Sequence, residues 1–314
     1  MQQAQQITQQ KRKGSFGRYV RTHPWLYLMM IPGLLYILLF HYVPMYGVVI
    51  AFQKFNFVKG IFGSKWIGLQ NFKELFSSEQ FLRVFRNSLE FSLIRLIFSF
   101  PMHIILALLL NEVRHMRYKK LVQTIIYIPH FISWVVVASL VTNLLMPTNE
   151  GAVNAFLGLF GIPPANYLTS PAHFRGIIVT AEIWKGAGWG TIVYLSALSQ
   201  VDQEIYEAAY IDGANRWKVM WHITFPCILS TVSIMLILRL GSLMSNGFEQ
   251  IYLLYSPMVY DVADVFETYT YRIGIQGGRY SYSAAVGMFQ SVVGFILIIT
   301  SNFISRKVGE SSLF

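Results

Sequence analysis

Apolar segments of roughly twenty residues recur along this chain, and they constrain its fold more than any other feature. The hydrocarbon core of a bilayer is about 30 Å thick, which an α-helix crosses in about 20 residues. Helices are favoured there because they satisfy their backbone hydrogen bonds internally. The pattern predicts an all-α membrane protein with a polar tail over residues 1–24 and a transmembrane domain over residues 25–314. Six transmembrane helices are expected, at about residues 25–44, 88–110, 121–146, 176–199, 227–248 and 283–305.

The composition agrees with this class, since 54% of the residues are hydrophobic and only 13% are charged. In a soluble protein, the net charge of +10 would suggest a nucleic-acid partner. Here the positive-inside rule explains it better, and no soluble domain remains to carry a nucleic-acid site. With six spans, one side holds both termini and the connections 111–120 and 201–226, with 13 Lys and Arg residues against nine on the other side. We therefore expect both termini in the cytoplasm, contact with membrane lipid, and no nucleic-acid partner.

The connection over residues 201–226 is long and amphipathic. Roughly twenty residues separate two apolar runs here, far more than a tight turn needs. Charged side chains such as Glu207 favour water, while aromatic ones such as Trp217 favour burial. Gly213 stands where a short helix would end in a left-handed cap, and Asp212 could accept a hydrogen bond there or begin the next turn. The stretch is typical of a loop that docks on another protein.

Three anchors in this loop carry a resemblance to a known family: Glu207-Ala208-Ala209, then Gly213, then Ile223-x-Phe225-Pro226. Together they resemble the cytoplasmic coupling loop of binding-protein-dependent ATP-binding-cassette (ABC) importer permeases, with Phe225 where Leu is usual. Segments elsewhere, such as WIGLQNF at 66–72 and YIPHFISW at 127–134, are similar to the carbohydrate branch of that family. This branch comprises the MalF-like permeases for oligosaccharides and polysaccharide fragments. The resemblance covers nearly the whole chain after residue 20.

The resemblance implies the type I ABC importer permease fold, with a cytoplasmic coupling helix, in a bacterial cytoplasmic membrane. It also implies four kinds of partner: a second permease subunit, ABC ATP-binding subunits, an extracytoplasmic solute-binding protein and an oligosaccharide substrate. Contacts to the ATP-binding subunits are then expected at Glu207, Ala208, Ala209, Asp212, Gly213, Ala214, Arg216 and Trp217. Nucleotide binding by those subunits would move this loop and switch the direction in which the central path opens.

No motif for nucleotide or metal chemistry occurs in the sequence. It contains no G-x-x-x-x-G-K-[ST], so we expect neither ATP binding nor enzyme activity in this chain, and we expect ATP and Mg in partner subunits. It also lacks H-E-x-x-H and C-x-x-C, so no metal site is expected. The single cysteine, Cys227, excludes an internal disulfide and is interpreted as a small buried residue.

Charged residues within the predicted spans are informative because each costs at least about 2.5 kcal/mol to insert. Glu182 and Lys185 lie three residues apart on one helical face, so a structural pair is favoured over a role in lining the sugar path. Arg95 and Arg239 have no helical partner and must face the bundle interior, water or a partner subunit. They are either structural or suited to an acidic sugar. The candidate substrate path comprises Arg95, Glu182, Lys185, Trp189, Arg239, Asn246 and Glu249.

Two further patterns leave alternatives open. The run Gly186-x-Gly188-x-Gly190 favours close helix packing over local unwinding of the fourth helix. Aromatic residues crowd the connection 249–282, where they form either a belt at the membrane interface or a surface that faces sugar or the binding protein. They are Tyr252, Tyr255, Tyr260, Phe266, Tyr269, Tyr271, Tyr280 and Tyr282.

The main alternative function is a secondary sugar transporter driven by an ion gradient. Such proteins show inverted repeats or carboxylates at the membrane midplane. Glu182 is the only clear candidate for such a carboxylate, and no convincing repeat is present. No catalytic constellation supports a third class, a membrane enzyme.

Overall fold

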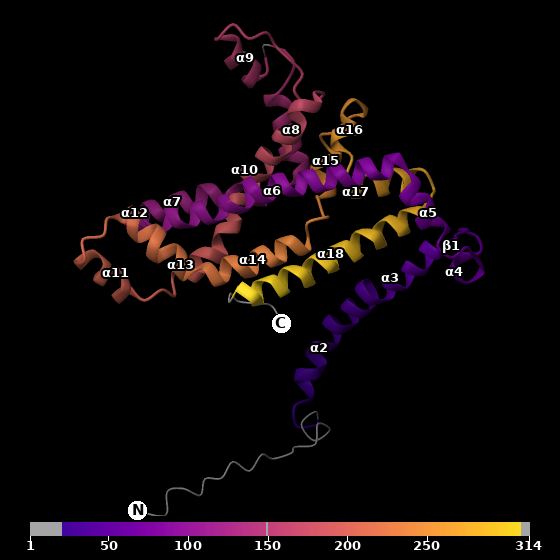
Figure 1. Ribbon diagram of the computed structural model, residues 1–314, viewed down its shortest axis with the longest axis horizontal. Coiled ribbons are helices and arrows are strands. Elements are labelled where there is room, and N and C mark those ends of the chain that lie inside the picture. The colour runs from indigo at the N-terminus through magenta and orange to yellow at the C-terminus, as the bar shows by residue number, and fades with distance from the viewer. Residues whose placement is uncertain (1–20, 149, 309–314) are drawn as a thin grey trace, which may run out of the picture.

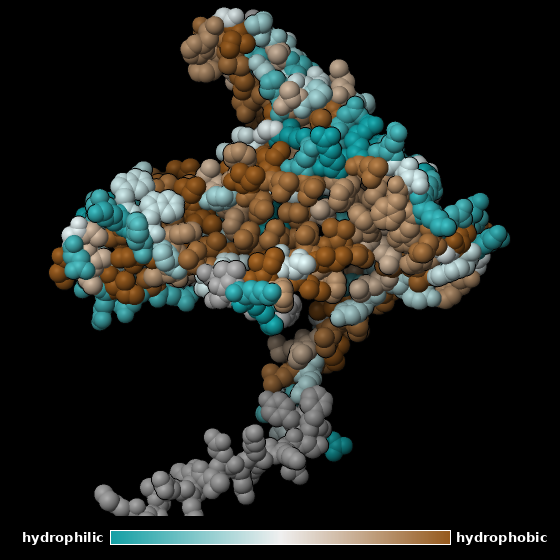
Figure 2. Space-filling model, in the orientation of Figure 1, coloured by the Kyte–Doolittle hydropathy of each residue, from teal (hydrophilic) through white to brown (hydrophobic). Residues whose placement is uncertain are grey.

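The computed structural model describes residues 21–148 and 150–308, and most of them are helical. Four helices form an elongated body in which α6 packs on α10 and α14 packs on α18 (Figure 1). They are α6 (Glu79–Asn111), α10 (Pro171–Leu198), α14 (Leu229–Gly241) and α18 (Tyr280–Val308). Apolar side chains cover most of the middle of this body, and hydrophilic ones gather at its two ends and on its upper side near α16 (Figure 2). Most of the predicted tail 1–24 lies outside the described residues.

Within the described residues, three helices are long and apolar enough to cross a membrane: Pro24–Phe52, Glu79–Asn111 and Tyr280–Lys307. Two bent pairs raise this number to as many as five, namely Met116–Phe131 with Trp134–Leu144 and Arg216–Cys227 with Leu229–Gly241. The fourth predicted span forms the continuous helix α10, which is not among the five. Glu182 and Lys185 lower its hydropathy, so its place in a membrane depends on how they are neutralised.

The first helical segment runs through α2 (Pro24–Ile37), η1 (Leu38–Tyr42), α3 (Val43–Met45) and η2 (Tyr46–Phe52). It leaves the body at an angle, and none of the side chains in α2 is buried (Figure 1). Only its end, η2, packs against α18. Such an apolar surface must be covered by lipid or by another chain.

A small cap follows this segment and closes one end of the body. Strands β1 (Gln53–Lys54) and β2 (Lys65–Trp66) pair antiparallel, with Gln53 opposite Trp66. Helices α4 (Gly60–Gly63) and α5 (Gln70–Ser77) complete the cap. The buried Asn71 on α5 donates to the carbonyl of Ala51 at 2.7 Å and so fastens the cap to the end of η2.

The third predicted span, 121–146, is not one straight helix. It divides into α7 (Met116–Tyr127), η3 (Ile128–Phe131) and α8 (Trp134–Leu144), with a bend of 100°. Pro129 explains the break, because it lacks an N–H donor and disfavours helix at the residue before it. Ser133 then begins α8 by accepting a hydrogen bond from the Val136 amide. After α8, the short helix α9 (Ala152–Gly158) is held by Asn154, which donates to the carbonyls of Met146 and Ala165.

The fifth predicted span, 227–248, also differs from expectation. Helix α14 stops at Gly241, and residues 242–247 are unwound up to Gly247, whose φ of 72° favours glycine. Cys227 at the other end is exposed in this chain, not buried as predicted. The 249–282 connection is largely helical, with α15 (Phe248–Tyr252), η5 (Pro257–Val259), α16 (Tyr260–Ala263), α17 (Phe266–Thr270) and η6 (Tyr271–Gln276).

Candidate functional site

A cluster of three charged side chains joins the long helices of the body. Arg95 on α6 and Arg239 on α14 both approach Glu182 on α10. The Arg95 Nε lies 2.5 Å from Glu182 Oε2, and the Arg239 Nη2 lies 3.5 Å from Oε1. The Arg95 side chain is 3% exposed and that of Arg239 is 35% exposed. Glu182 therefore serves two guanidinium groups, and a second carboxylate, that of Glu267, is close enough to Arg95 to interact with it electrostatically.

The predicted pair between Glu182 and Lys185 is wrong. The Lys185 ammonium donates instead to the carbonyl of His130 in η3, at 2.7 Å, and lies 5.6 Å from the centre of the Trp134 ring. The break at Pro129 explains this choice, because it leaves carbonyl groups of η3 without helical partners. Lys185 therefore holds the bent third span against α10.

A cavity of about 420 Å³ opens beside the charge cluster. Glu182 and Arg239 lie in its wall together with Trp189, whose ring stacks on His130 with 4.5 Å between centroids and an interplanar angle of 2°. The polar part of the wall also includes His103, Tyr194, Ser99 and Ser242. The cavity thus combines an aromatic face, hydroxyl and imidazole groups and a partly exposed cation, which are groups that bind sugars and carboxylates.

The glycines of α10 bring neighbouring elements close to this cavity. A Cβ on Gly188 would lie 2.0 Å from the Ile126 carbonyl oxygen of α7, and one on Gly190 would lie 2.5 Å from the His103 ring. Helix α10 stays continuous through this run. The packing interpretation is therefore confirmed at Gly188 and Gly190, whereas a Cβ on Gly186 would meet nothing within 4 Å.

Asn246 belongs to the support of the cluster. It is 1% exposed and ties the unwound segment 242–247 to three helices. Arg95 Nη1 donates to its backbone carbonyl at 2.8 Å and to its Oδ1 at 3.0 Å. Its backbone amide donates to Glu267 on α17 at 2.9 Å, and Gln290 on α18 donates to the same carboxylate at 3.1 Å. Sequence reasoning missed Glu267 and Gln290 as site residues, because no spacing along one helix relates them to Asn246.

Glu249 lies apart from this cluster. It is exposed on α15, close enough to Lys185 to interact with it electrostatically. Of the seven predicted path residues, Glu182, Trp189 and Arg239 line the cavity, Arg95 and Asn246 support it, and Lys185 and Glu249 are outside its wall. The structure therefore brings only part of the predicted path to one surface.

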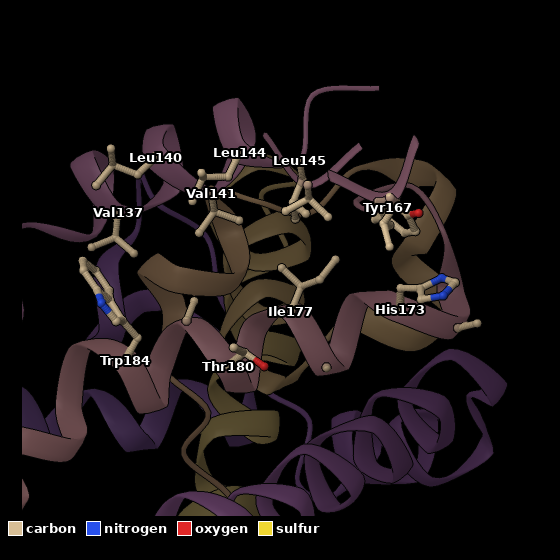
Figure 3. A pocket seen from close by; sticks show the side chains of 15 residues that line it. Val137, Leu140, Val141, Leu144, Leu145, Tyr167, His173, Ile177, Thr180 and Trp184 are labelled. Atoms are coloured by element: carbon tan, nitrogen blue, oxygen red, sulfur yellow. The ribbon is translucent and has the colours of Figure 1, made fainter. Parts of the chain in front are cut away.

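A second, larger cavity of about 730 Å³ lies between α8, α9 and α10 (Figure 3). Its wall is mainly aliphatic, with Val137, Leu140, Val141 and Leu144 from α8 facing Ile177 of α10. Such a wall offers a sugar few hydrogen-bond partners. The smaller, charged cavity is therefore the better candidate for a polar substrate.

The 201–226 connection folds into α11 (Gln203–Ile211), α12 (Arg216–Val219), η4 (Met220–Thr224) and α13 (Phe225–Cys227). Gly213 has a φ of 77°, its amide donates to the Tyr210 carbonyl, and the Ala214 amide donates to the Ala209 carbonyl. These two bonds form the predicted left-handed cap. Asp212 does not begin the next helix. Asn215 begins α12, because its side chain accepts a hydrogen bond from the Lys218 amide at 2.8 Å.

This connection lies at the end of the body opposite the β1–β2 cap, with the residues predicted to contact the ATP-binding subunits (Figure 1). Glu207, Ala208, Asp212, Gly213, Arg216 and Trp217 are exposed, Ala214 is half-buried and Ala209 is buried. Ile211 is 86% exposed and Trp217 is 65% exposed, so large apolar groups stand in solvent here. On the inner side, burial raises the pKa of the Tyr206 phenol. An exposed apolar surface on a rigid helical turn is suited to bind a protein partner.

The 249–282 connection is fastened to the N-terminal parts of α6 and α10. Asn87 on α6 donates to the carbonyls of Asp261 and Asp264, and accepts from Arg175 on α10 at 2.8 Å. Asp264 pairs with Arg272. Burial raises the pKa of Asp264, although Thr268 and Arg272 act in the opposite direction. The connection is therefore held as a fixed part of the body.

A family model described as "Binding-protein-dependent transport system inner membrane component" matches residues 103–310. The chain belongs to this family. Protein LplB of Bacillus subtilis (strain 168) is 49% identical over 92% of this chain and 91% of its own length. The polygalacturonan/rhamnogalacturonan transport system permease protein YteP of the same organism is 45% identical over 97% of this chain and 94% of its own length.

Solved structures show the same fold. A chain of a bacterial ABC transporter involved in the import of the acidic polysaccharide alginate is 43% identical, with a TM-score of 0.86 over 93% of this chain and 98% of that chain. A chain of the bacterial alginate ABC transporter in complex with alginate pentasaccharide-bound periplasmic protein is 41% identical, with a TM-score of 0.86 over 95% and 99%. This family member is thus a helical type I permease of an ABC sugar importer, a multi-pass protein of the inner membrane. The secondary-transporter alternative is not favoured.

Proposed function

We propose that this permease moves acidic oligosaccharides through the 420 Å³ cavity beside Glu182 and Arg239. It works with a second permease subunit, two ATP-binding subunits and an extracytoplasmic solute-binding protein. ATP and Mg are bound by the ATP-binding subunits, and this chain holds no cofactor. It crosses the membrane six times, with both termini and the 201–226 connection in the cytoplasm. In this arrangement α10 is the fourth span, with the charges of Glu182 and Lys185 neutralised inside the protein.

The sharing of one carboxylate by two arginines carries the proposal. Arg95 is buried and close to Glu182, whereas Arg239 is more distant and stands partly exposed in the cavity wall. A sugar carboxylate that reaches Arg239 gains a charge-assisted hydrogen bond in a site of low dielectric constant. Polygalacturonan and the acidic polysaccharide alginate, which appear in the descriptions of two relatives, carry such carboxylates.

Coupling is proposed to act through α11 and α12. Their exposed residues Ile211 and Trp217 would enter a surface cleft of an ATP-binding subunit, with Ala208 allowing close approach. The chain then continues directly through η4 and α13 into α14, which carries Arg239. A displacement of the coupling helices would therefore reach one wall of the substrate cavity through two helical parts that meet at a bend of 61°.

The test compares uptake of a galacturonic acid pentasaccharide and of a neutral pentasaccharide by the assembled transporter in liposomes. Arg239→Gln should lower uptake of the acidic sugar roughly tenfold, the effect of one lost charge-assisted bond, and change uptake of the neutral sugar little. Lys185→Gln is the matched control, because it also removes a cation from a span but lies outside the cavity wall. Equal effects of Arg239→Gln on both sugars would refute the acidic substrate, and uptake without the ATP-binding subunits would refute the coupling.

A further inference from the structure

The loop between strands β1 and β2 carries large apolar side chains that almost nothing in this chain covers. Phe57, Val58 and Phe62, which we call the apolar tip, are between 80% and 95% exposed. The loop is nevertheless fixed, because Asn56 Oδ1 accepts from the Val58 amide at 2.9 Å and the Asn56 amide donates to Ser64 Oγ at 3.0 Å. A fixed loop that exposes three large apolar groups indicates an apolar partner.

The apolar tip folds back along the first helical segment. The centre of the Phe62 ring lies 5.9 Å from that of Tyr46. Ile61 shares the wall of a cavity of about 560 Å³ with Tyr42, one turn further into the segment. A helix that begins at Pro24 crosses about 30 Å of hydrocarbon in about 20 residues, so Tyr46 lies just past the hydrocarbon boundary. The apolar tip is therefore at the level where hydrocarbon meets the lipid headgroups.

Helix α18, another candidate span, gives the same depth. Its first residue, Tyr280, contacts Phe57 with 6.2 Å between ring centres, and Ser281 Oγ accepts from the Phe55 amide at 2.9 Å. Trp66 on β2 is also exposed, and Trp and Tyr are the side chains enriched at membrane interfaces. Two spans thus place the loop at the end where they leave the hydrocarbon.

Two lysines at the base of the loop indicate the charge of the partner. Lys54 on β1 lies directly opposite Lys65 on β2 in the antiparallel pair. Side chains in such positions have Cβ atoms about 5 Å apart, and like charges there are destabilising. Both lysines are exposed, and no ion pair among the residues that the structure describes includes either of them. An anionic group between the two ammonium groups would relieve the repulsion.

The arginines at the same end of the body behave differently from this lysine pair. Five of them pair with carboxylates of this chain, namely Arg83, Arg86, Arg175, Arg272 and Arg279. The partner of Arg279 is Glu74 on α5, which belongs to the same cap as the lysines. The cap therefore uses its carboxylate elsewhere, and the two lysines remain for an anion from outside the chain.

We propose that residues 54–66 anchor the cap in the outer leaflet, with the apolar tip at the hydrocarbon boundary and a lipid phosphate between Lys54 and Lys65. The occupant is an anionic phospholipid, because such a lipid offers acyl chains and an anion at the depth where the loop holds apolar groups and cations. The choice of leaflet follows from the proposed topology, and the anchor does not depend on the substrate. It would fix the height of the first segment, whose helix α2 buries no side chain against the body.

The experiment measures the depth of the apolar tip in the assembled transporter, in vesicles of equal parts phosphatidylglycerol and phosphatidylcholine. Val58→Cys in a Cys227→Ser background carries a fluorescent label that brominated acyl chains quench in the membrane and iodide quenches in water. The label should be quenched by brominated lipid and protected from iodide. Ile211→Cys is the matched control, because it is a similarly exposed apolar site in the 201–226 connection, and it should show no quenching by lipid.

The same label tests the lysine pair when only one of the two lipids is brominated at a time. The quenching constant should be about fivefold larger for phosphatidylglycerol, the effect of a lysine near an anionic surface. Lys54→Gln combined with Lys65→Gln should bring the ratio of the two constants to about one. Lys73→Gln removes an exposed cation of α5 in the same cap, and it is the control that should preserve the ratio.

Four results would overturn the anchor. Quenching by iodide without quenching by lipid would place the apolar tip in water, and protection from both would place it against a second permease or a binding protein. An unchanged ratio in the double lysine variant would exclude the bound phosphate, and an equal fall with Lys73→Gln would reduce the preference to the net charge of the cap. None of these measurements uses sugar uptake, so their failure leaves the proposed substrate and coupling standing.

Discussion

Arg95 and Glu182 meet at 2.5 Å in the interior of the body and join α6 to α10 across 87 positions of sequence. The same guanidinium donates to the carbonyl of Asn246 and so fixes the unwound end of α14. One buried arginine thus sets the relative positions of three helices around the charged cavity. Its charge is tolerated because Glu182 and backbone oxygens surround it.

Replacing Glu182 with Gln should destabilise the protein strongly. The change leaves Arg95 buried without a carboxylate, a loss of about 3–5 kcal/mol when one partner of a buried pair is removed. The double variant Glu182→Gln with Arg95→Met should recover part of this loss, because it no longer buries an unpaired charge. Thermal unfolding of the purified assembly measures both.

Lys185→Gln supplies the control for this cycle. Its partner is the His130 carbonyl, so its effect should add to that of Glu182→Gln with little interaction energy. The pairing of Arg95 with Glu182 would be contradicted if the substitutions at these two residues changed stability additively. A large interaction energy between the substitutions at Lys185 and Glu182 would contradict it as well.

Gly188 and Gly186 form a matched pair of sites on one helix. A methyl group at Gly188 would lie 2.0 Å from the Ile126 carbonyl, so Gly188→Ala should push α7 away from α10 and cost about 1–3 kcal/mol. A methyl group at Gly186 meets nothing within 4 Å, so Gly186→Ala should leave stability nearly unchanged. The midpoint of thermal unfolding is measured for both variants. An equal change of this midpoint in the two variants would argue against the close approach of α7 to α10.

Asn87 should control the mobility of the segment 261–264. Its amide group bonds the carbonyls of Asp261 and Asp264 and accepts from Arg175. Asn87→Leu removes all three bonds while keeping the side-chain size, so backbone amides near these carbonyls should exchange hydrogen faster. Mass spectrometry of exchanged peptides provides the measurement, and unchanged exchange in this segment would show that other contacts hold it.

The order of the long apolar segments follows from the sequence, because an apolar run long enough to cross hydrocarbon favours a helix. The number of six spans stays a prediction, since the described residues hold three to five candidate spans. The cap at Gly213 also follows, since glycine favours the left-handed conformation that ends α11. The partner of Glu182 does not follow, because spacing along one helix identifies only neighbours on that helix, and Arg95 and Arg239 come from other helices. Pro129 did signal the break in the third span, but the apolar run around it favoured a straight helix. The roles of Glu267 and Gln290 do not follow either, since they depend on the unwound segment 242–247.

Gly213 should be needed for coupling and dispensable for folding. Its φ of 77° costs a residue with a side chain about 1–2 kcal/mol, and nothing lies within 4 Å of its added Cβ. Gly213→Ala should therefore distort the turn between α11 and α12 locally, with the protein still inserted in the membrane. Transport and the stimulation of ATP hydrolysis by substrate should fall together, because both depend on the orientation of this turn. Gly60→Ala is the control: its φ of 64° and open surroundings are the same, but it lies in the cap at the other end of the body. An equal loss of transport in both variants would mean that backbone strain alone is responsible, whereas normal transport by Gly213→Ala would remove this turn from the coupling path.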